Sequence, residues 1–315
     1  MVTPGTSWAQ RETRVPRIGV LWHAGSENEE RIYLTALREG FHDMGYIEGK
    51  TIVLENRFPN EEPERMLSMA SELAALPVDI LIAATTLPAI AAQRATTTIP
   101  VIFVAVFDPI ASKLVSNLPR PGGNVTGFTH ITAELTAKRL EILKEAIPGL
   151  SRAALLVNST DETTRQRYIE ESRVAAAALE ITVQPVGVRS LDDFDRAFDE
   201  VVMARAEGVC VGANGLFFKG REMLAKLALK HRLPLVVYSL ETFEAGALMS
   251  YGADITPMFH RVAIYVDKIL NGAKVGDLPV EQPTKFQFRI NVNVARTLGI
   301  TIPPLLLARA DQVIE

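Results

Sequence analysis

Short apolar runs and longer segments of helical period alternate along the chain from about Arg17 onward. The short runs are rich in β-branched residues, as buried parallel strands are, and the longer segments carry their apolar residues on one helical face. In the first part of the chain this pattern predicts strands at 17–22, 51–58, 79–84 and 100–107, with helices at 29–44, 62–76 and 87–95. Strand–helix–strand units of this kind build a parallel sheet covered by helices.

The second part of the chain repeats the same order of elements. It predicts strands at 152–157, 182–188, 208–211 and 235–238, with helices at 162–179, 191–206 and 219–231. The fourth strand of each part follows a helix and opens at a proline, Pro100 in the first and Pro234 in the second. Three successive strand–helix pairs in matching order favour two similar lobes over one large sheet.

The segments outside the repeat predict how the two lobes are connected. A Pro/Gly-rich turn at 120–127 separates the repeats, and the chain after Tyr238 is best read as returning to the first lobe near 250–254 and leaving it again near 284. We therefore expect an α/β fold of two doubly wound, Rossmann-like lobes with parallel sheets joined by a three-crossing hinge. The expected division is lobe 1 at 15–127 plus 251–284, and lobe 2 at 128–250 plus 285–315.

Composition narrows the classes of partner. The chain has 315 residues, of which 48% are apolar and 22% charged, which is an ordinary globular composition. Its net charge of −4 and the lack of a basic run argue against nucleic acid or an anionic membrane surface, and leave a small molecule as the expected partner. No apolar stretch reaches the ~18–20 residues of a membrane-spanning helix.

No motif for a cofactor, a metal or catalysis is present. The segment 45–51 has three residues between its glycines where a phosphate loop needs four, and at 208–215 Cys210 replaces a glycine of the dinucleotide fingerprint. The five histidines include no pair at metal-ligand spacing, and Cys210 lies within an apolar strand, as an inert buried thiol does. We expect no cofactor and no enzymatic activity, although acids assembled only in space stay open as an alternative.

The ligand is expected beyond the carboxyl ends of the strands, where open α/β sheets bind their ligands. Two lobes that face each other through these ends form a cleft. The candidate ligand-binding residues are Trp22, His23, Thr85, Thr86, Phe107, Asp108, Asn158, Asn214, Phe217, Tyr238, Glu241, Tyr251 and Asp254.

Particular residue types among these candidates suggest the chemistry of the ligand. Thr85 and Thr86 offer hydroxyls beside free backbone N–H groups at a helix N-terminus, which suits a carboxylate, although they could simply cap the helix. Asp108, Glu241 or Asp254 could pair with a ligand ammonium, while Asp108 before a proline is equally suited to a turn. The aromatic candidates and the neighbouring Phe218 suit an apolar or aromatic ligand body, with a place in the core as the alternative for each ring.

Several strings along the chain resemble the ABC-transporter substrate-binding proteins of the tryptophan/tyrosine type. They are RIGVL at 17–21, PVIFVAVFDP at 100–109, PRPGGNVTG at 119–127, KRLEILK at 138–144, KHRLP at 230–234, EAGALMSYG at 244–252, YVDKILNGAK at 265–274, LPVEQPTKF at 278–286 and IPPLLLARAD at 302–311. The resemblance covers about residues 17 to 315. It implies a type I periplasmic-binding architecture with one ligand in the interlobe cleft, delivered to a membrane permease that a separate ATPase drives.

The resemblance also implies a periplasmic location, although members normally carry an export signal or a lipoprotein cysteine and this chain has neither. The start, 1–14, is polar and turn-rich. Either it is a short disordered leader, or an export signal was removed and a start methionine added, as the small residues around Thr6–Ala9 suggest.

We therefore expect a non-catalytic, monomeric receptor that closes on a small carboxylate-bearing ligand, an aromatic or apolar amino acid or a related acid. Two other classes stay open. A two-lobed glycosyl- or phosphoryl-transferase would need a nucleotide site that the motifs do not supply. A ligand-sensing regulator would need a DNA-binding domain, and too few residues precede the first strand for a helix-turn-helix.

Overall fold

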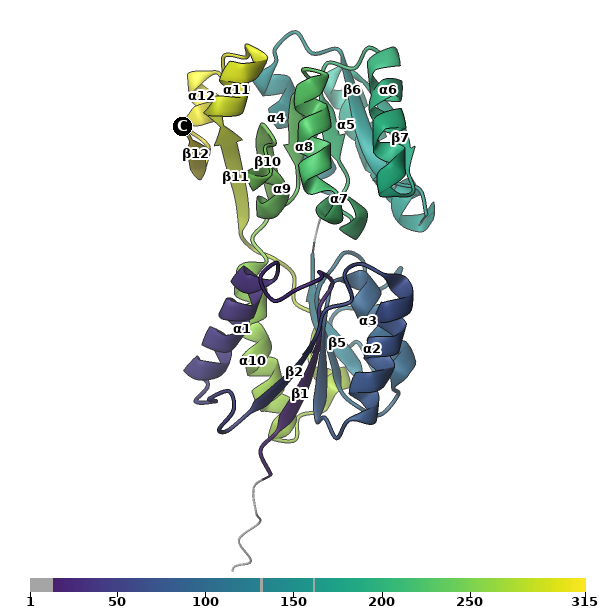
Figure 1. Ribbon diagram of the computed structural model, residues 1–315, viewed down its shortest axis with the longest axis vertical. Helices are drawn as coiled ribbons and strands as arrows, with labels where there is room; N and C mark the ends of the chain where they lie inside the picture. The colour runs from purple at the N-terminus through teal and green to yellow at the C-terminus, as the bar shows by residue number, and fades with distance from the viewer. Residues whose placement is uncertain (1–13, 131–132, 161) are drawn as a thin grey trace, which may run out of the picture.

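A computed structural model of the chain describes residues 14–130, 133–160 and 162–315. Figure 1 shows two α/β lobes arranged one above the other along the long axis of the molecule. We call the five-stranded sheet and the helices on it the first lobe, and the seven-stranded sheet and its helices the second. The two interpretations of the amino terminus concern residues that lie almost wholly outside this described part of the chain.

The first lobe contains a parallel sheet in the order β2-β1-β3-β4-β5. Its strands are β1 (Arg17–Leu21), β2 (Val53–Arg57), β3 (Ile80–Ala84), β4 (Val101–Val106) and β5 (Val125–Thr129). Its helices are α1 (Arg31–Asp43), α2 (Pro63–Ala75), α3 (Thr86–Ala95) and α10 (Thr256–Leu270), with the short 3₁₀ turn η2 (Val275–Asp277).

Both faces of this sheet are buried, which explains its continuous apolar strands. In β3 the side chains of Ile80 and Ile82 pack with α1 and α10, while those of Leu81 and Ala83 pack with α2 and α3 on the opposite face. This is the alternation that a strand imposes on successive side chains. The lobe is therefore a three-layer α/β unit, and α10 belongs to it although it lies far along the chain.

The second lobe contains a sheet in the order β12-β11-β10-β9-β8-β6-β7. Its strands are β6 (Arg152–Asn158), β7 (Thr182–Val188), β8 (Val209–Val211), β9 (Leu235–Val237), β10 (Met249–Ala253), β11 (Phe286–Asn291) and β12 (Gln312–Ile314). Its helical elements are α4 (Thr136–Ala146), α5 (Glu162–Leu179), η1 (Leu191–Asp193), α6 (Phe194–Met203), α7 (Gly215–Lys219), α8 (Arg221–Lys230), α9 (Leu240–Glu244), α11 (Val292–Leu298) and α12 (Pro304–Leu307). Among the described strands, only β10 and β11 pair antiparallel.

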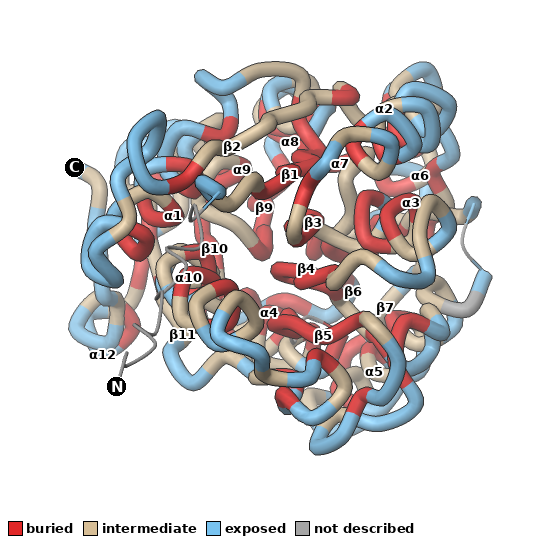
Figure 2. Tube along the Cα trace, turned by 90° about the horizontal axis from the view of Figure 1, so that it is seen from below, coloured by how far each residue is buried: buried red, intermediate tan, exposed pale blue. Residues whose placement is uncertain are grey.

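Figure 2 shows buried strands at the centre of the molecule and exposed outer surfaces on the surrounding helices. The predicted fold class is confirmed, and most strand bounds agree with the predicted ones to within a few residues. One predicted helix, 191–206, is instead the turn η1 followed by α6. Another, 219–231, begins only at Arg221, because α7 precedes it and Gly220, where the two helices meet, packs so closely on Phe194 that a Cβ there would lie 2.6 Å from the ring.

The chain passes between the two sheets three times, as predicted from the segments outside the repeat. It crosses between β5 and α4, between β10 and α10, and between η2 and β11. The first sheet extends through β5 to Thr129 and the second through β10 to Ala253, slightly past the predicted switch points. The division of the chain between the lobes by residue number stays a prediction.

Candidate functional site

Residues of both lobes line one pocket between the carboxyl ends of the two sheets. Its volume is about 530 Å³. From the first lobe it is lined by Ala24, Glu29, Asn60 and Glu61, and from the second by Leu191, Phe218, Lys219, Gly220, Arg221, Glu222, Met223 and Lys226. Acidic and basic side chains are mixed along this pocket, so it offers partners to both ends of a zwitterion.

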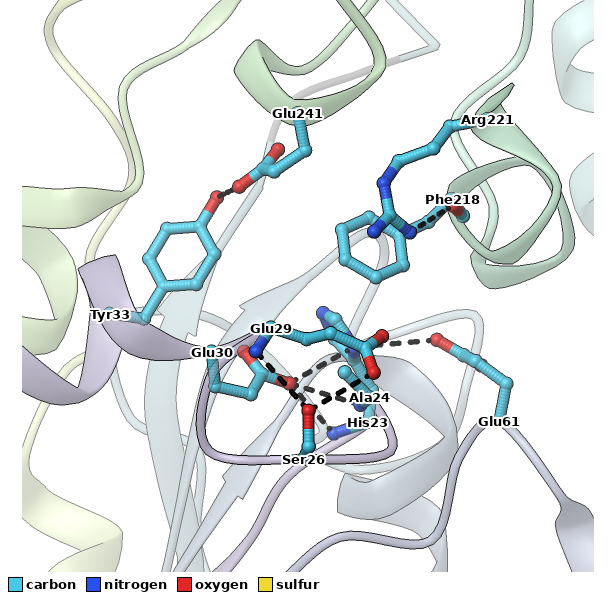
Figure 3. A network of polar contacts seen from close by, with 10 residues as sticks. All are labelled: His23, Ala24, Ser26, Glu29, Glu30, Tyr33, Glu61, Phe218, Arg221 and Glu241. Carbon is cyan, nitrogen blue, oxygen red and sulfur yellow. Dashed lines mark hydrogen bonds and ion pairs between the residues drawn. The ribbon is translucent and has the colours of Figure 1, made fainter. Parts of the chain in front are cut away.

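A buried histidine lies between two carboxylates in the loop that follows β1, next to the first-lobe residues Ala24 and Glu61 that line the pocket. His23 Nδ1 lies 3.2 Å from Glu30 Oε1 and 3.5 Å from Glu61 Oε1. The Glu30 side chain is fully buried, and its Oε1 accepts the backbone N–H of Ala24 at 3.0 Å. Figure 3 shows the three side chains together, with Glu61 reaching in from the loop after β2. One carboxylate oxygen of Glu30, Oε2, has no hydrogen-bond partner.

The charges of this cluster are strongly coupled. Burial by itself lowers the pKa of His23, but the carboxylates of Glu30 and Glu61 outweigh burial and raise it above the ordinary value of 6.5. Burial raises the pKa of Glu30 and the pKa of Glu61, and the charge of His23 opposes both shifts. The cluster therefore holds a proton more readily than its separate groups would, because a proton offsets part of the buried negative charge.

The second lobe meets this cluster directly. The ring of Phe218 on α7 packs edge-on against the His23 ring, with 4.8 Å between the ring centroids. The Lys219 ammonium donates to the backbone carbonyl of Asn60 at 3.2 Å. Gly215, the first residue of α7, lies so close to the Glu61 carboxylate that a Cβ there would be 2.2 Å from its Oε2. The loops after β1 and β2 are thus in van der Waals contact with α7.

Two further polar contacts join the lobes. Tyr33 on α1 donates a hydrogen bond from its hydroxyl to Glu241 Oε1 on α9, as Figure 3 shows. Burial, followed by the charge of Glu241, raises the pKa of Tyr33 well above 10. On another side, Arg167 on α5 pairs with Asp108 after β4 and with Glu134 before α4. The predicted candidates Asp108 and Glu241 therefore both lie at the interface between the lobes, each with a protein partner.

The threonine candidates occupy the N-terminus of α3, and their backbone is strained. Thr85 has φ +74° and ψ −179°, a conformation that costs a β-branched residue ~1–3 kcal/mol. Its N–H donates to the carbonyl of Val104 at 2.7 Å, and the Thr86 hydroxyl oxygen accepts the N–H of Phe107 at 3.3 Å. The Thr85 side chain makes no capping hydrogen bond to α3.

The aromatic candidates divide into two groups. Trp22 and Phe217 are fully buried: Trp22 stacks between Phe58 and Phe259 inside the first lobe, and Phe217 packs on Phe194 inside the second. These two rings are therefore core residues of the two lobes. Three others reach the interface between the lobes or the hinge, namely Phe107, Tyr238 and Tyr251.

Each of these three rings has a defined setting. The partly buried Phe107 comes from the first lobe, packs against the core of the second and lies 5.7 Å from the ring of His130. The Tyr238 hydroxyl donates to the Asn214 carbonyl at 3.0 Å. Tyr251, half-buried on β10, stacks on Phe286 at 6.3 Å.

The two asparagine candidates, Asn158 and Asn214, hydrogen-bond to each other in the second lobe. Asn158 Nδ2 donates to Asn214 Oδ1 at 2.8 Å, and the same oxygen accepts the N–H of Leu216 at the start of α7. Asp254, at the second crossing, accepts the N–H of Thr256 and the side-chain amide of Gln287, both at 3.1 Å. Asn214 and Asp254 therefore have structural contacts of their own, beside any role toward a ligand.

The sequence patterns missed several residues that the structure brings to this interface. They are Glu30, Tyr33, Glu61, Arg167 and Lys219. One signal was available for Glu61, because the carboxyl end of β2 lies at the same sheet edge as those of β1 and β3. Glu30 ends the turn before α1 and meets His23 within the first lobe. Tyr33, Arg167 and Lys219 come from helices, and each contacts the other lobe, so their proximity depends on how the lobes meet.

The described part of the chain shows neither a metal centre nor a membrane span. No group of three or more His, Cys, Asp or Glu side chains there is arranged to hold a metal ion. None of the helices in those residues combines the length and the apolar composition that a membrane-spanning helix needs.

Two α/β lobes whose strand ends face a shared site, linked by three crossings, define the class of type I periplasmic-binding folds. Residues 29–314 match the sequence model of the family described as ABC transporter substrate binding protein. The chain belongs to this family, whose members bind solutes. The resemblance seen in the sequence strings is confirmed.

Relatives of known structure or name agree with this assignment. The chain is 25% identical over 278 residues to the tyrosine-binding protein of Clostridioides difficile. The aligned region covers 88% of this chain and 78% of that relative. A conserved domain protein from Vibrio cholerae superposes with a TM-score of 0.88 at 26% identity, over 95% of this chain and 100% of the other. The ABC domain from Streptococcus pneumoniae in complex with L-Trp gives a TM-score of 0.87 at 25% identity, over 96% of this chain and 100% of that chain.

Proposed function

We propose that the protein is the extracytoplasmic receptor of an ABC import system, which binds one small amino-acid-like carboxylate between its lobes and closes on it. The observation that carries the proposal is that polar and aromatic side chains of both lobes meet across the interface, above all Tyr33 with Glu241 and His23 with Phe218. Of these four residues, Phe218 lines the 530 Å³ pocket and the others lie outside its lining. Closure of two lobes over a ligand is the kind of conformational change that a permease can recognise. The proposal includes a periplasmic location, delivery to a membrane permease and a monomeric chain.

The ligand class is inferred from the residues at the site together with the relatives. One relative is named for tyrosine, and another was solved with L-Trp. In our proposal Thr85, Thr86 and the first N–H groups of α3 hold the carboxylate, since the Thr86 hydroxyl has a proton to donate and the helix end is positive. Glu241 or Asp254 holds the ammonium group.

The ligand body would pack on the aromatic rings that reach the interface between the lobes. Phe107, Phe218 and Tyr251 offer such surfaces. Trp22 and Phe217 are fully buried, so neither is part of this surface. A ring of phenyl or indole size is the expected body.

Native mass spectrometry of gently purified protein, followed by a thermal-shift screen of amino acids and aromatic acids, tests the proposal. A true ligand at 100 times its Kd adds ~2.7 kcal/mol to the free energy of unfolding, which corresponds to roughly 5–10 °C in Tm for lobes of this size. We expect such a shift with an aromatic or large apolar amino acid and no shift with the corresponding amine that lacks the carboxylate. Turnover of a nucleotide sugar together with no shift across the whole panel would overturn the receptor function.

A further inference from the structure

Arg139 on α4 is a fully buried cation that lacks a counter-charge among the described residues. Its exposed fraction is 0%. One nitrogen, Nε, donates to the carbonyl of Tyr251 at 2.9 Å, but Nη1 and Nη2 have no hydrogen-bond partner. No carboxylate of the described chain pairs with it, in contrast to Arg167 and Arg261, which form ion pairs with acids at or near the surface.

Burying an unpaired guanidinium lowers the free energy of unfolding unless a bound anion compensates its charge. A guanidinium stays protonated at any pH that a protein survives, so Arg139 cannot escape the cost by losing its charge. Burying an ion without a partner costs several kcal/mol, and buried charges in native proteins are paired or bind a ligand. The two free Nη groups therefore indicate a partner that is not part of this chain.

Two more polar side chains near Arg139 are buried and have unsatisfied atoms. Thr136 lies three residues earlier on α4, hence on the same face of the helix, and its fully buried hydroxyl has no partner. His130 follows β5, is 4% exposed, and has no partner at Nε2. Burial, followed by the charge of Arg139, lowers the pKa of His130 to about 3, so the imidazole is neutral at pH 7.

The chemistry of these free groups is that of hydrogen-bond donors. Arg139 has N–H groups only, Thr136 offers an O–H, and neutral His130 offers an N–H when its proton is on Nε2. The Cys210 sulfur also lies beside the guanidinium and is a weak acceptor for it. Burial raises the pKa of this thiol to about 11, although Arg139 opposes the shift, so the thiol is uncharged at neutral pH. A positive charge whose neighbours are all uncharged, several of them donors, attracts an anion.

We propose that Arg139, Thr136 and His130 form a buried anion-binding pocket at the hinge that takes a small monovalent anion, with a carboxylate group as the preferred occupant. The carboxylate has two oxygens with about four acceptor positions, which match two guanidinium nitrogens, one hydroxyl and one imidazole N–H. The donors of this pocket are different from those at the N-terminus of α3, where the proposed function puts the ligand carboxylate. Phe107 lies next to both, because Thr86 accepts its N–H and its ring is 5.7 Å from that of His130.

The position of the pocket gives the anion a structural role as well. His130 stands at the first crossing between the lobes, and Arg139 is bonded to Tyr251 just before the second. An anion held by both residues therefore links two of the three chain crossings. The occupant is either a free inorganic ion such as chloride or the carboxylate of an organic acid, and the two sources differ in size and shape.

The test measures the Tm of the whole chain without any amino-acid solute. Protein dialysed into sodium HEPES is compared, at constant ionic strength, with protein in sodium acetate and in sodium chloride. We expect acetate near saturation to raise Tm by about 5 °C, with a smaller rise in chloride. An equal or larger rise in chloride would identify the occupant as a free inorganic ion in the same pocket, provided that the variants below remove it.

Three variants assign any such rise to the pocket. Arg139→Gln removes the charge and is expected to abolish the acetate-dependent rise. Thr136→Val removes only a donor that has no protein partner, so it should leave the fold intact and weaken acetate binding about tenfold, which keeps the test valid if the arginine variant fails to fold. Arg261→Gln, which removes an arginine paired with Glu281 away from the pocket, should leave the rise unchanged.

Two results would overturn the pocket. One is the absence of any anion-dependent rise in the wild-type protein, which would mean that water satisfies these donors. The other is a rise that Thr136→Val leaves unchanged and that Arg139→Gln, where it folds, also leaves unchanged, which would put the anion elsewhere. Because no solute is present, neither result bears on the proposed receptor function.

Discussion

The hydroxyl of Tyr33 on α1 and the carboxylate of Glu241 on α9 form a hydrogen bond that joins the two lobes. The two residues lie far apart in the sequence, and Tyr33 is 7% exposed. A hydrogen bond to a charged acceptor contributes ~1.5–3 kcal/mol when it is shielded from water. This one exists only while the lobes are together, so its free energy favours the closed arrangement.

Tyr33→Phe should therefore shift the protein toward separated lobes. Losing about 1.5 kcal/mol of closure corresponds to roughly tenfold weaker affinity for any ligand that requires closure. Small-angle X-ray scattering should show a larger radius of gyration for the free variant, and calorimetry should show the weaker affinity.

Tyr46→Phe is the matched control for this prediction. The Tyr46 hydroxyl also donates to a carboxylate, that of Asp267 at 2.9 Å, but both residues belong to the first lobe. Its loss should leave the radius of gyration and the affinity unchanged. Equal behaviour of the two variants would show that the Tyr33–Glu241 contact has no part in closure.

The cluster of His23, Glu30 and Glu61 predicts a pH-dependent stability. The folded-state pKa of each group is raised above its ordinary value, so each contributes most to the free energy of unfolding at low pH. The contribution of the two glutamates is complete below about 4.5 and that of His23 below about 6.5, and each is lost as pH rises through the raised folded value. We expect Tm to fall between pH 5 and pH 8.

Glu30→Gln tests the assignment of that pH dependence. The variant removes one raised pKa and also the carboxylate that raises the pKa of His23 most, so its Tm should change less with pH than that of the wild-type protein. Glu72→Gln, at an exposed ion pair with Arg57, is a suitable control and should keep the wild-type profile. A Glu30→Gln profile as steep as the wild-type one would assign the pH dependence to other groups.

Replacing both threonines at the start of α3 by valine tests the carboxylate role proposed for them. Valine keeps the shape of threonine and removes the hydroxyl, so Thr85→Val with Thr86→Val should weaken carboxylate ligands at least tenfold in calorimetry. Thr98→Val, in the loop before β4 at the opposite end of the strands, should have no effect. Unchanged affinity in the double variant would move the carboxylate to another part of the site.

The contact between α1 and α10 predicts a stability defect that lies far from the ligand. Gly40 on α1 lies so close to α10 that a Cβ there would be 2.1 Å from the carbonyl oxygen of His260. Gly40→Ala should force the helices apart and lower the free energy of unfolding by ~1–3 kcal/mol, measured by urea denaturation. Gly149→Ala, at a glycine with open space around it, should change stability little. A fully stable Gly40→Ala variant would mean that α10 is free to move on the first lobe.

The order of most helices and strands could be predicted from the sequence because each of the longer elements has a local pattern of apolar residues. The buried strands β3 and β4 are continuous apolar runs, and α5 has the same bounds in the structure as the helix predicted at 162–179. The elements that were not predicted, such as α7, α9 and β12, are only a few residues long, and a few residues do not establish a period. The helix α4 was not among the predicted elements, and its apolar pattern is weak because its inner face includes the buried Arg139.

The candidate site was only partly accessible, for a different physical reason. The rule that ligands bind at strand ends correctly brought His23, Asp108 and Glu241 to the interface between the lobes. It could not show that Tyr33 joins Glu241, because that contact depends on the angle at which one lobe meets the other. Glu61 follows β2 at the same sheet edge as His23, but no candidate came from the end of that strand. Nor does the identity of a ring say which way it points, which is why Trp22 and Phe217 were candidates although both are core residues.

The one cysteine of the sequence gives the protein a practical property. Cys210 is fully buried in β8, and burial raises the pKa of its thiol to about 11, so it is both inaccessible and almost wholly protonated at neutral pH. Maleimide dyes will therefore not react with Cys210 in the native protein. A cysteine introduced at an exposed position that lines the pocket, such as Lys226, would be the sole labelling site. The fluorescence of a dye attached there would report the binding of any solute that makes the lobes close, with no other change to the protein.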